Sequence, residues 1–150
     1  MAHDLVLARH LAASPGAVYR CWTEAELLKR WFAPLPGETV EAVVDPVPGG
    51  RFHTRMRFEE HGEIGGEGCV LVAEPGRRFV FTDALTAGFR PGREPFFTAD
   101  IRLTESEGGC EYRVTALHAE AETARRHAGM GFESGWGQCA TQLEAVARTL

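Results

Sequence analysis

Few residues of this sequence combine a reactive side chain with a suggestive position, and Asp83 is the first of them. It follows the apolar segment Arg78–Thr82 and shares its alternation parity with Phe79 and Phe81. If that side of the strand faces a cavity, desolvation would raise the pKa of the Asp83 carboxyl group. The carboxyl group could then act as a general acid or base, or orient a polar ligand. The alternative is that Asp83 begins the next turn and accepts hydrogen bonds from nearby backbone.

The histidines and cysteines do not form the pattern of a metal site. The histidines are His3, His10, His53, His61, His118 and His127, and the cysteines are Cys21, Cys69, Cys110 and Cys139. They include no His pair at i, i+4 and no C-x-x-C pair. His53 alternates with arginines, which indicates a solvent-facing side chain, while His118 and His127 suit loop contacts or helix caps. We therefore predict no metal and no cofactor, and we expect the cysteines to be buried thiols.

Known catalytic motifs are also missing from the sequence. It contains no nucleophile elbow, Walker loop, Rossmann glycine fingerprint or His-Glu-x-x-His segment. Asp83 is thus a weak candidate for catalysis, and a binding protein is favoured over an enzyme.

Composition narrows the function class further. A length of 150 residues with 44% hydrophobic residues fits one domain spanning residues 1–150. The net charge of −5 argues against a nucleic-acid partner. No apolar run approaches the ~18 residues of a membrane span. The segment Met1–Asp4 lacks the basic start of an export signal, so we expect a cytoplasmic protein without membrane contact.

Hydrophobic periodicity predicts one strand, two short helices, a run of strands and a long terminal helix. The first strand spans residues 4–11, and Ser14-Pro15 predicts a capped helix start. In Arg51–Phe58, apolar residues and Thr54 alternate with Arg and His, which is typical of an antiparallel strand with one wet face. The other strands are expected at 40–44, 66–74, 78–84, 96–105 and 110–118.

The terminal helix begins in an unusually glycine-rich segment, which holds Gly129, Gly131, Gly135 and Gly137. Each glycine costs roughly 1 kcal/mol relative to alanine in a helix interior. Two explanations stay open: flexible helix initiation with tight packing, or a helix surface thinned to form a cavity wall. Phe132 and Trp136 would stand above that surface.

These elements predict an α+β fold of the helix-grip type. A curved antiparallel sheet of about six to seven strands would wrap around the long terminal helix, with the two short helices after the first strand. The loop at residues 87–95 could either cover the cavity mouth or be an ordinary exposed loop.

The sequence resembles the family of activators of the heat-shock-protein-90 ATPase, within the START-like (SRPBCC) superfamily. The matching residues are Ser14-Pro15, Val18-Tyr19, Trp22-Thr23, Leu27–Pro34 (LLKRWFAP), Asp45–Phe52 (DPVPGGRF), Phe81-Thr82-Asp83, Arg126-His127, Met130-Gly131-Phe132 and Gly135-Trp136. The resemblance implies an apolar cavity between the sheet and the terminal helix. Across the superfamily, such cavities hold lipids, sterols, polyketides or plant hormones, and a few members cyclise or hydrolyse substrates.

The favoured hypothesis is a protein that binds a small hydrophobic or aromatic molecule in this cavity. The candidate ligand-binding residues are Trp31, Phe52, Thr54, Met56, Phe58, Phe81, Asp83, Phe97, Tyr112, Phe132, Trp136 and Cys139. One alternative is a cyclase- or hydrolase-like enzyme that uses a cavity carboxylate from Asp83, Asp45 or Glu41. A second alternative is a chaperone cofactor or another protein-partner role, including a homodimer built on a sheet edge; it requires an exposed apolar patch. The eukaryotic activators carry a separate chaperone-binding domain that this sequence does not resemble.

Overall fold

The computed structural model describes residues 3–150. Met1 and Ala2, which belong to the segment in which no export signal was expected, lie outside the described residues. Its main feature is a seven-stranded antiparallel sheet in the order β1-β9-β8-β5-β4-β3-β2. The strands are β1 (Asp4–Leu11), β2 (Glu38–Val44), β3 (Arg51–Phe58), β4 (Gly62–Glu74), β5 (Arg78–Thr82), β8 (Thr98–Ser106) and β9 (Gly109–Leu117). A small ribbon of β6 (Leu85–Thr86) and β7 (Arg90–Pro91) lies beside it. This arrangement confirms the predicted helix-grip fold.

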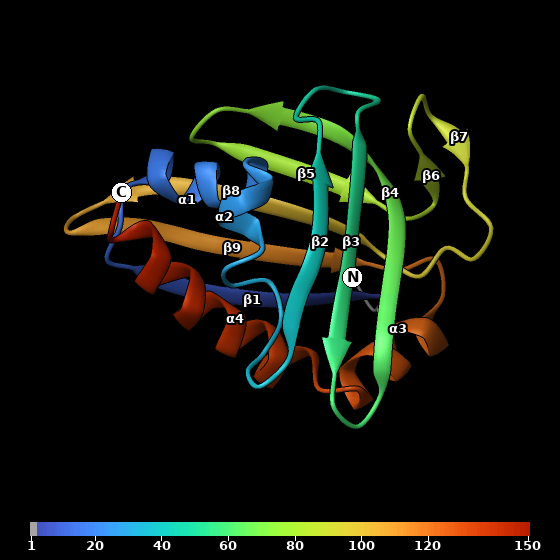
Figure 1. Ribbon diagram of the computed structural model, residues 1–150. Coiled ribbons are helices and arrows are strands. Elements are labelled where there is room, and N and C mark those ends of the chain that lie inside the picture. Colours follow the sequence, from blue (N-terminus) through green and yellow to red (C-terminus); the bar gives the residue numbers. More distant parts are fainter. Residues whose placement is uncertain (1–2) are drawn as a thin grey trace.

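The sheet is strongly curved: strands β2, β3 and β4 run across the direction of β1, β8 and β9 (Figure 1). The helices are α1 (Pro15–Thr23), α2 (Ala25–Leu28), α3 (Ala121–Gly129) and α4 (Phe132–Ala147). Helix α4 packs against β1 and α1. The Ser14 hydroxyl accepts a hydrogen bond from the backbone N–H of Ala17 at 3.1 Å, so the predicted cap of α1 is confirmed.

Helix α3 was not expected from the sequence. Its residues, AETARRHAG, include only two buried side chains, Ala124 and His127, which lie three positions apart on one face. Such a sparse apolar pattern resembles a polar loop when it is read without the structure. Gly131, in the left-handed region at φ 91°, then turns the chain from α3 into α4. The turn at a positive φ explains why glycine stands there.

Strand β3 has the two faces that its alternation predicts. Phe52 is buried on the concave side, whereas the arginines on the other side form ion pairs with glutamates of β2 and β4. One of these joins Arg55 Nη1 to Glu63 Oε1 at 2.7 Å. His53 lies within the same network, between Glu41 and Glu67. Exposed pairs of this kind contribute about 0–1 kcal/mol each, so they mark the solvent side of the sheet more than they stabilise it.

A cluster of aromatic rings surrounds Trp22 of α1, which is fully buried. Its indole lies edge-on to Trp31 at 4.8 Å between ring centroids and approaches Phe81 at 5.6 Å. It also stacks on Trp136 of α4 at 6.1 Å. Its Nε1–H donates to the Tyr112 hydroxyl at 3.2 Å. Trp22 therefore joins α1, the sheet and α4 at one point.

Among the helices that the structure describes, none combines the length and apolar character needed to cross a membrane.

Candidate functional site

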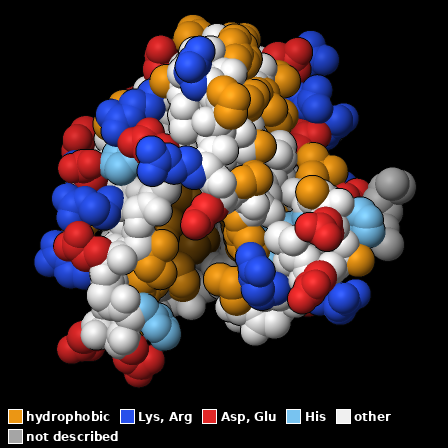
Figure 2. All heavy atoms as spheres, turned by 90° about the vertical axis from the view of Figure 1, so that its right-hand side faces the viewer, with side chains coloured by type: hydrophobic (Ala, Val, Ile, Leu, Met, Phe, Trp, Pro, Cys, Tyr) orange, Lys and Arg blue, Asp and Glu red, His pale blue; other side chains and the backbone are white. Residues whose placement is uncertain are grey.

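A cavity of about 320 Å³ lies between the concave face of the sheet and helix α4. It opens on the face shown in Figure 2, where hydrophobic side chains lie at the bottom of a hollow. Its walls are lined by Phe32, Ala33, Pro34, Phe52, Thr54, Met56, Gly66, Glu67, Gly68, Phe81, Thr82, Asp83, Phe97, His127, Met130, Gly131, Phe132, Gly135, Trp136 and Cys139. The volume is at the lower end of the about 300–1,000 Å³ that is usual for small-molecule pockets.

Helix α4 supplies one wall through Phe132, Trp136 and Cys139, which follow each other at steps of four and three residues. This is the spacing of one helix face. Gly135 lies on the same wall, and a Cβ atom added there would meet no other atom within 4 Å. The glycine therefore leaves room in the cavity, as the thinned-wall interpretation predicts. Gly137, in contrast, packs against the Arg9 side chain on the other side of the helix.

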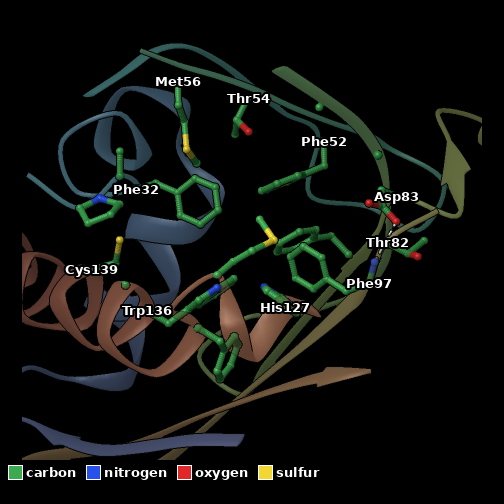
Figure 3. Close-up of a pocket in the computed structure, with 18 of the residues that line it drawn as sticks. Phe32, Phe52, Thr54, Met56, Thr82, Asp83, Phe97, His127, Trp136 and Cys139 are labelled. Carbon is green, nitrogen blue, oxygen red and sulfur yellow. Dashed lines mark hydrogen bonds between the residues drawn. The ribbon is translucent and has the colours of Figure 1, made fainter. Parts of the chain in front are cut away.

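The sheet supplies the opposite wall. Phe52, Thr54 and Met56 alternate along β3 toward the cavity, and the Phe52 ring stacks on Phe81 of β5 at 4.0 Å (Figure 3). Phe97, just before β8, packs against Phe81 with ring centroids 6.1 Å apart. An aromatic wall of this kind suits a planar apolar molecule, because aromatic rings attract each other in stacked and edge-on arrangements.

The structure brings nine of the predicted residues together around the cavity. They are Phe52, Thr54, Met56, Phe81, Asp83, Phe97, Phe132, Trp136 and Cys139. Burial raises the pKa of the Cys139 thiol to about 12, so this side chain stays protonated at neutral pH and behaves as an apolar group.

Three predicted residues lie outside the cavity lining. Trp31 is buried behind it, and its indole N–H donates to the Cys21 carbonyl at 3.0 Å, while the neighbouring Phe32 faces the cavity instead. The Tyr112 hydroxyl is engaged by Trp22 in the core. Phe58, at the end of β3, covers Gly37, where an added Cβ atom would clash with its ring. These three side chains hold the fold around the cavity and do not touch the space itself.

Asp83 lines the cavity and also holds the segment that leads into β8. Its Oδ1 accepts hydrogen bonds from the backbone N–H of Phe96 at 2.8 Å and from that of Phe97 at 3.2 Å. Figure 3 shows the one to Phe97. Burial raises the pKa of its carboxyl group, and these backbone hydrogen bonds oppose that increase. Asp83 thus lies at the cavity, as one interpretation of the sequence expects, while its backbone partners lie 13 and 14 residues further along the chain and not in the turn that begins there. The other two carboxylates considered for catalysis, Asp45 and Glu41, are exposed and do not line the cavity.

Among the lining residues that were not predicted as site residues, the one with ionisable chemistry of most interest is His127 of α3, which is buried at 6% exposure. Its Nδ1 lies 2.8 Å from Nε2 of His118, and Nδ1 of His118 lies 2.7 Å from the backbone carbonyl oxygen of His3. Burial, and secondarily the neighbouring His118, lowers the pKa of His127 to about 4. His127 is therefore a neutral polar group in a mostly apolar wall. The three-residue spacing of Ala124 and His127 could have indicated that His127 is buried, but only if the segment had been recognised as a helix.

This pKa predicts how the stability depends on pH. The unfolded chain binds a proton at His127 near pH 6.5, but the folded chain does so only near pH 4. Because the unfolded state then holds more protons, the free energy of unfolding should fall as the pH drops through this window, by roughly 3 kcal/mol from this group. Urea unfolding at several pH values should show a shallower decline for His127→Asn than for the wild type. Parallel curves for the two proteins would contradict the assignment.

The loop at residues 87–95 does not line the cavity. The backbone N–H of Gly88 donates to the carbonyl of Gly49 at 2.8 Å, and the Phe89 ring lies over Gly49. The loop thus packs on the turn between β2 and β3, and of the two possibilities left open by the sequence, the structure favours an ordinary exposed loop. No group of three or more metal-ligating side chains occurs within residues 3–150.

Comparison with known protein families and solved structures identifies the family of this chain. The family described as "Activator of Hsp90 ATPase homolog 1-like protein" matches residues 12–148. The chain belongs to this family. The resemblance noted in the sequence is thereby confirmed. No curated protein matches the chain significantly.

Solved structures of similar proteins have the same fold. Protein NE0264 from Nitrosomonas europaea has a TM-score of 0.95 at 37% sequence identity, covering 99% of this chain and 96% of its own. A protein from Rhodobacter sphaeroides has a TM-score of 0.84 at 22% identity, covering 100% of this chain and 95% of its own. An AHSA1-like protein from Aeromonas hydrophila has a TM-score of 0.71 at 20% identity, covering 97% of this chain and 92% of its own. The Nitrosomonas protein supports the family relationship, whereas the other two share the fold.

Proposed function

We propose that this chain, acting as one domain over residues 1–150, binds a small apolar or aromatic molecule in the cavity between the sheet and α4. The observation that carries the proposal is the aromatic lining of a space that the side chains leave open, bordered by Gly135. Burying apolar ligand surface contributes roughly 25 cal/mol per Å². A close-packed core would have filled such a space. Phe52, Phe81 and Trp136 would provide most of the contact area.

Native mass spectrometry of freshly purified protein tests the proposal. We expect a stoichiometric adduct of low mass, which solvent extraction releases as an apolar or aromatic compound. The adduct should be absent from Gly135→Leu protein, because the new side chain occupies the cavity. If the purified chain carries no adduct and also fails to bind N-phenyl-1-naphthylamine, a probe that fluoresces in apolar sites, the proposal is wrong.

The second candidate function is a cyclase- or hydrolase-like enzyme. Asp83 is the best candidate for its catalytic carboxyl group, because Asp83 lines the cavity whereas Asp45 and Glu41 are exposed. A carboxyl group whose pKa is raised by burial can hold a proton for transfer to a bound substrate. Incubation of the identified ligand with the protein should then give a changed product, and Asp83→Asn should lose turnover while retaining the ligand. If the ligand is recovered chemically unchanged, the enzyme hypothesis is wrong and only the binding function remains.

A protein-partner role is the third candidate, and the surface gives it less support. In the described part of the chain, the exposed large hydrophobic side chains come from separate elements, including Val6 of β1, Ile64 of β4 and Met130 after α3. A homodimer could still form on the free edges of the sheet at β1 or β2. Light scattering tests the homodimer, and a pull-down with a purified chaperone tests the cofactor role.

A further inference from the structure

The hydrogen bonds between His118 and His127 determine which atom the cavity presents to a ligand. A backbone carbonyl can only accept, so Nδ1 of His118 carries the proton that is donated to the carbonyl of His3. In neutral His118, Nε2 is then an acceptor. The partner of that acceptor is Nδ1 of His127, which must therefore carry the proton in their 2.8 Å hydrogen bond. The remaining nitrogen of neutral His127, Nε2, is left with a lone pair.

This lone pair has no partner in the described part of the chain. Nε2 of His127 forms no hydrogen bond with any other part of residues 3–150. His127 is 6% exposed and borders the cavity near Phe97 (Figure 3), at 4.8 Å between ring centroids. Its ring also lies 5.1 Å from that of Phe132. Within residues 3–150, Nε2 of His127 is not sealed off from solvent, so a ligand in the cavity can reach this acceptor and supply a donor.

The other polar groups around the cavity fit the same kind of ligand. The Asp83 carboxylate is a second acceptor, whereas no lysine or arginine side chain lines the cavity. Glu67 also borders the space, but its carboxylate pairs with Arg51 on the outer face of the sheet. Thr82 is engaged with Thr98 at 2.7 Å, and the Thr54 hydroxyl can either donate or accept. The electrostatics therefore disfavour an anionic ligand.

We infer that the cavity takes an uncharged aromatic molecule that carries a hydroxyl group, and that this hydroxyl donates a hydrogen bond to Nε2 of His127. The inference rests on the proposed binding function and specifies its ligand class. His118 acts as a positioning residue, because it fixes the tautomer of His127 without touching the ligand.

Three matched probes test this inference by displacement of N-phenyl-1-naphthylamine at neutral pH. 2-Naphthol carries the donor, 2-methylnaphthalene has nearly the same shape without it, and 2-naphthoate carries a negative charge. A hydrogen bond is worth about 0.5–1.5 kcal/mol net, which corresponds to a factor of up to about 10 in affinity. We expect the wild type to prefer 2-naphthol over 2-methylnaphthalene by about that factor and to bind 2-naphthoate most weakly.

The variant His127→Asn separates the acceptor from the packing. The asparagine amide can replace Nδ1 as the partner of His118, but it lacks an atom at the position of Nε2. We expect it to bind 2-naphthol and 2-methylnaphthalene with similar affinity. A long-range proton–nitrogen correlation spectrum of the wild type provides a readout that does not depend on any variant, since it distinguishes the two neutral tautomers of His127. It should report protonated Nδ1.

The outcomes separate this inference from the proposed function. If the wild type binds all three probes equally, or binds 2-naphthoate most tightly, the inference fails while the cavity remains a binding site. A preference for 2-naphthol that persists in His127→Asn would assign the acceptor to another group and overturn the role of His127, as would a spectrum with protonated Nε2. If neither N-phenyl-1-naphthylamine nor any of the three probes binds, both the proposed function and the inference are wrong.

Discussion

Gly135→Leu is expected to weaken the binding of N-phenyl-1-naphthylamine by about 10- to 100-fold, because a ligand would have to share the cavity with the new side chain at an overpacking cost of about 1–3 kcal/mol. Gly135 lines the cavity, and an added Cβ atom there points into open space. Leucine is also the better helix former by up to about 1 kcal/mol. The variant should therefore fold at least as stably as the wild type in urea. Loss of binding would then reflect the blocked cavity.

Gly129→Leu is the matched control for this variant. Gly129 ends α3, is exposed and also has no atom within 4 Å of an added Cβ, but it does not line the cavity. We expect this control to bind the probe as tightly as the wild type. Equal binding by wild type, Gly135→Leu and Gly129→Leu would show that the probe binds elsewhere on the protein.

Trp22→Ala should lower the free energy of unfolding by roughly 3–5 kcal/mol, the usual cost of deleting a large buried ring. Trp22 has no exposed surface and contacts Phe32 of the cavity wall at 5.2 Å and Trp136 at 6.1 Å between ring centroids. Its removal would also leave the Tyr112 hydroxyl without its donor. Urea unfolding measures the loss directly. Because Trp22 supports Trp136, we also expect weaker probe binding under conditions in which the variant is still folded.

Two further variants calibrate the Trp22 result. Tyr112→Phe removes only the hydroxyl that Trp22 engages, and leaving the buried indole N–H unpaired should cost about 1–3 kcal/mol. Val6→Ala, at a residue that is 45% exposed on β1, should change the stability by about 0.5 kcal/mol or less. A loss below about 1 kcal/mol for Trp22→Ala would contradict the central role of this residue in the core.

The fold was predictable because its signals are local. The alternation in Arg51–Phe58 sets both faces of β3, and Ser14-Pro15 sets the start of α1. Helix α3 was missed because only Ala124 and His127 are buried on its surface. A helix that buries so little gives no apolar period to recognise.

The site was predictable in part, for a different reason. Residues such as Phe52 and Met56 share a strand face, and a strand face can be assigned from the sequence. Trp31 and Phe32 are adjacent, and the four-residue helix α2 before them is too short for periodicity to tell which of the two faces the cavity. Tyr112 lies on the buried face of β9, but alternation does not say which element covers that position. Long-range packing decides such cases.

The central claim is that a small apolar molecule occupies the cavity, and methionine methyl NMR tests it most directly. The sequence contains three methionines, of which Met56 and Met130 line the cavity, whereas Met1 stands at the first position of the chain. On titration of methyl-labelled protein with 2-naphthol, we expect saturable shifts of both the Met56 and Met130 signals at one ligand per chain. If the Met56 and Met130 signals do not move at a ligand concentration that saturates binding, the ligand lies outside the cavity and the account is wrong.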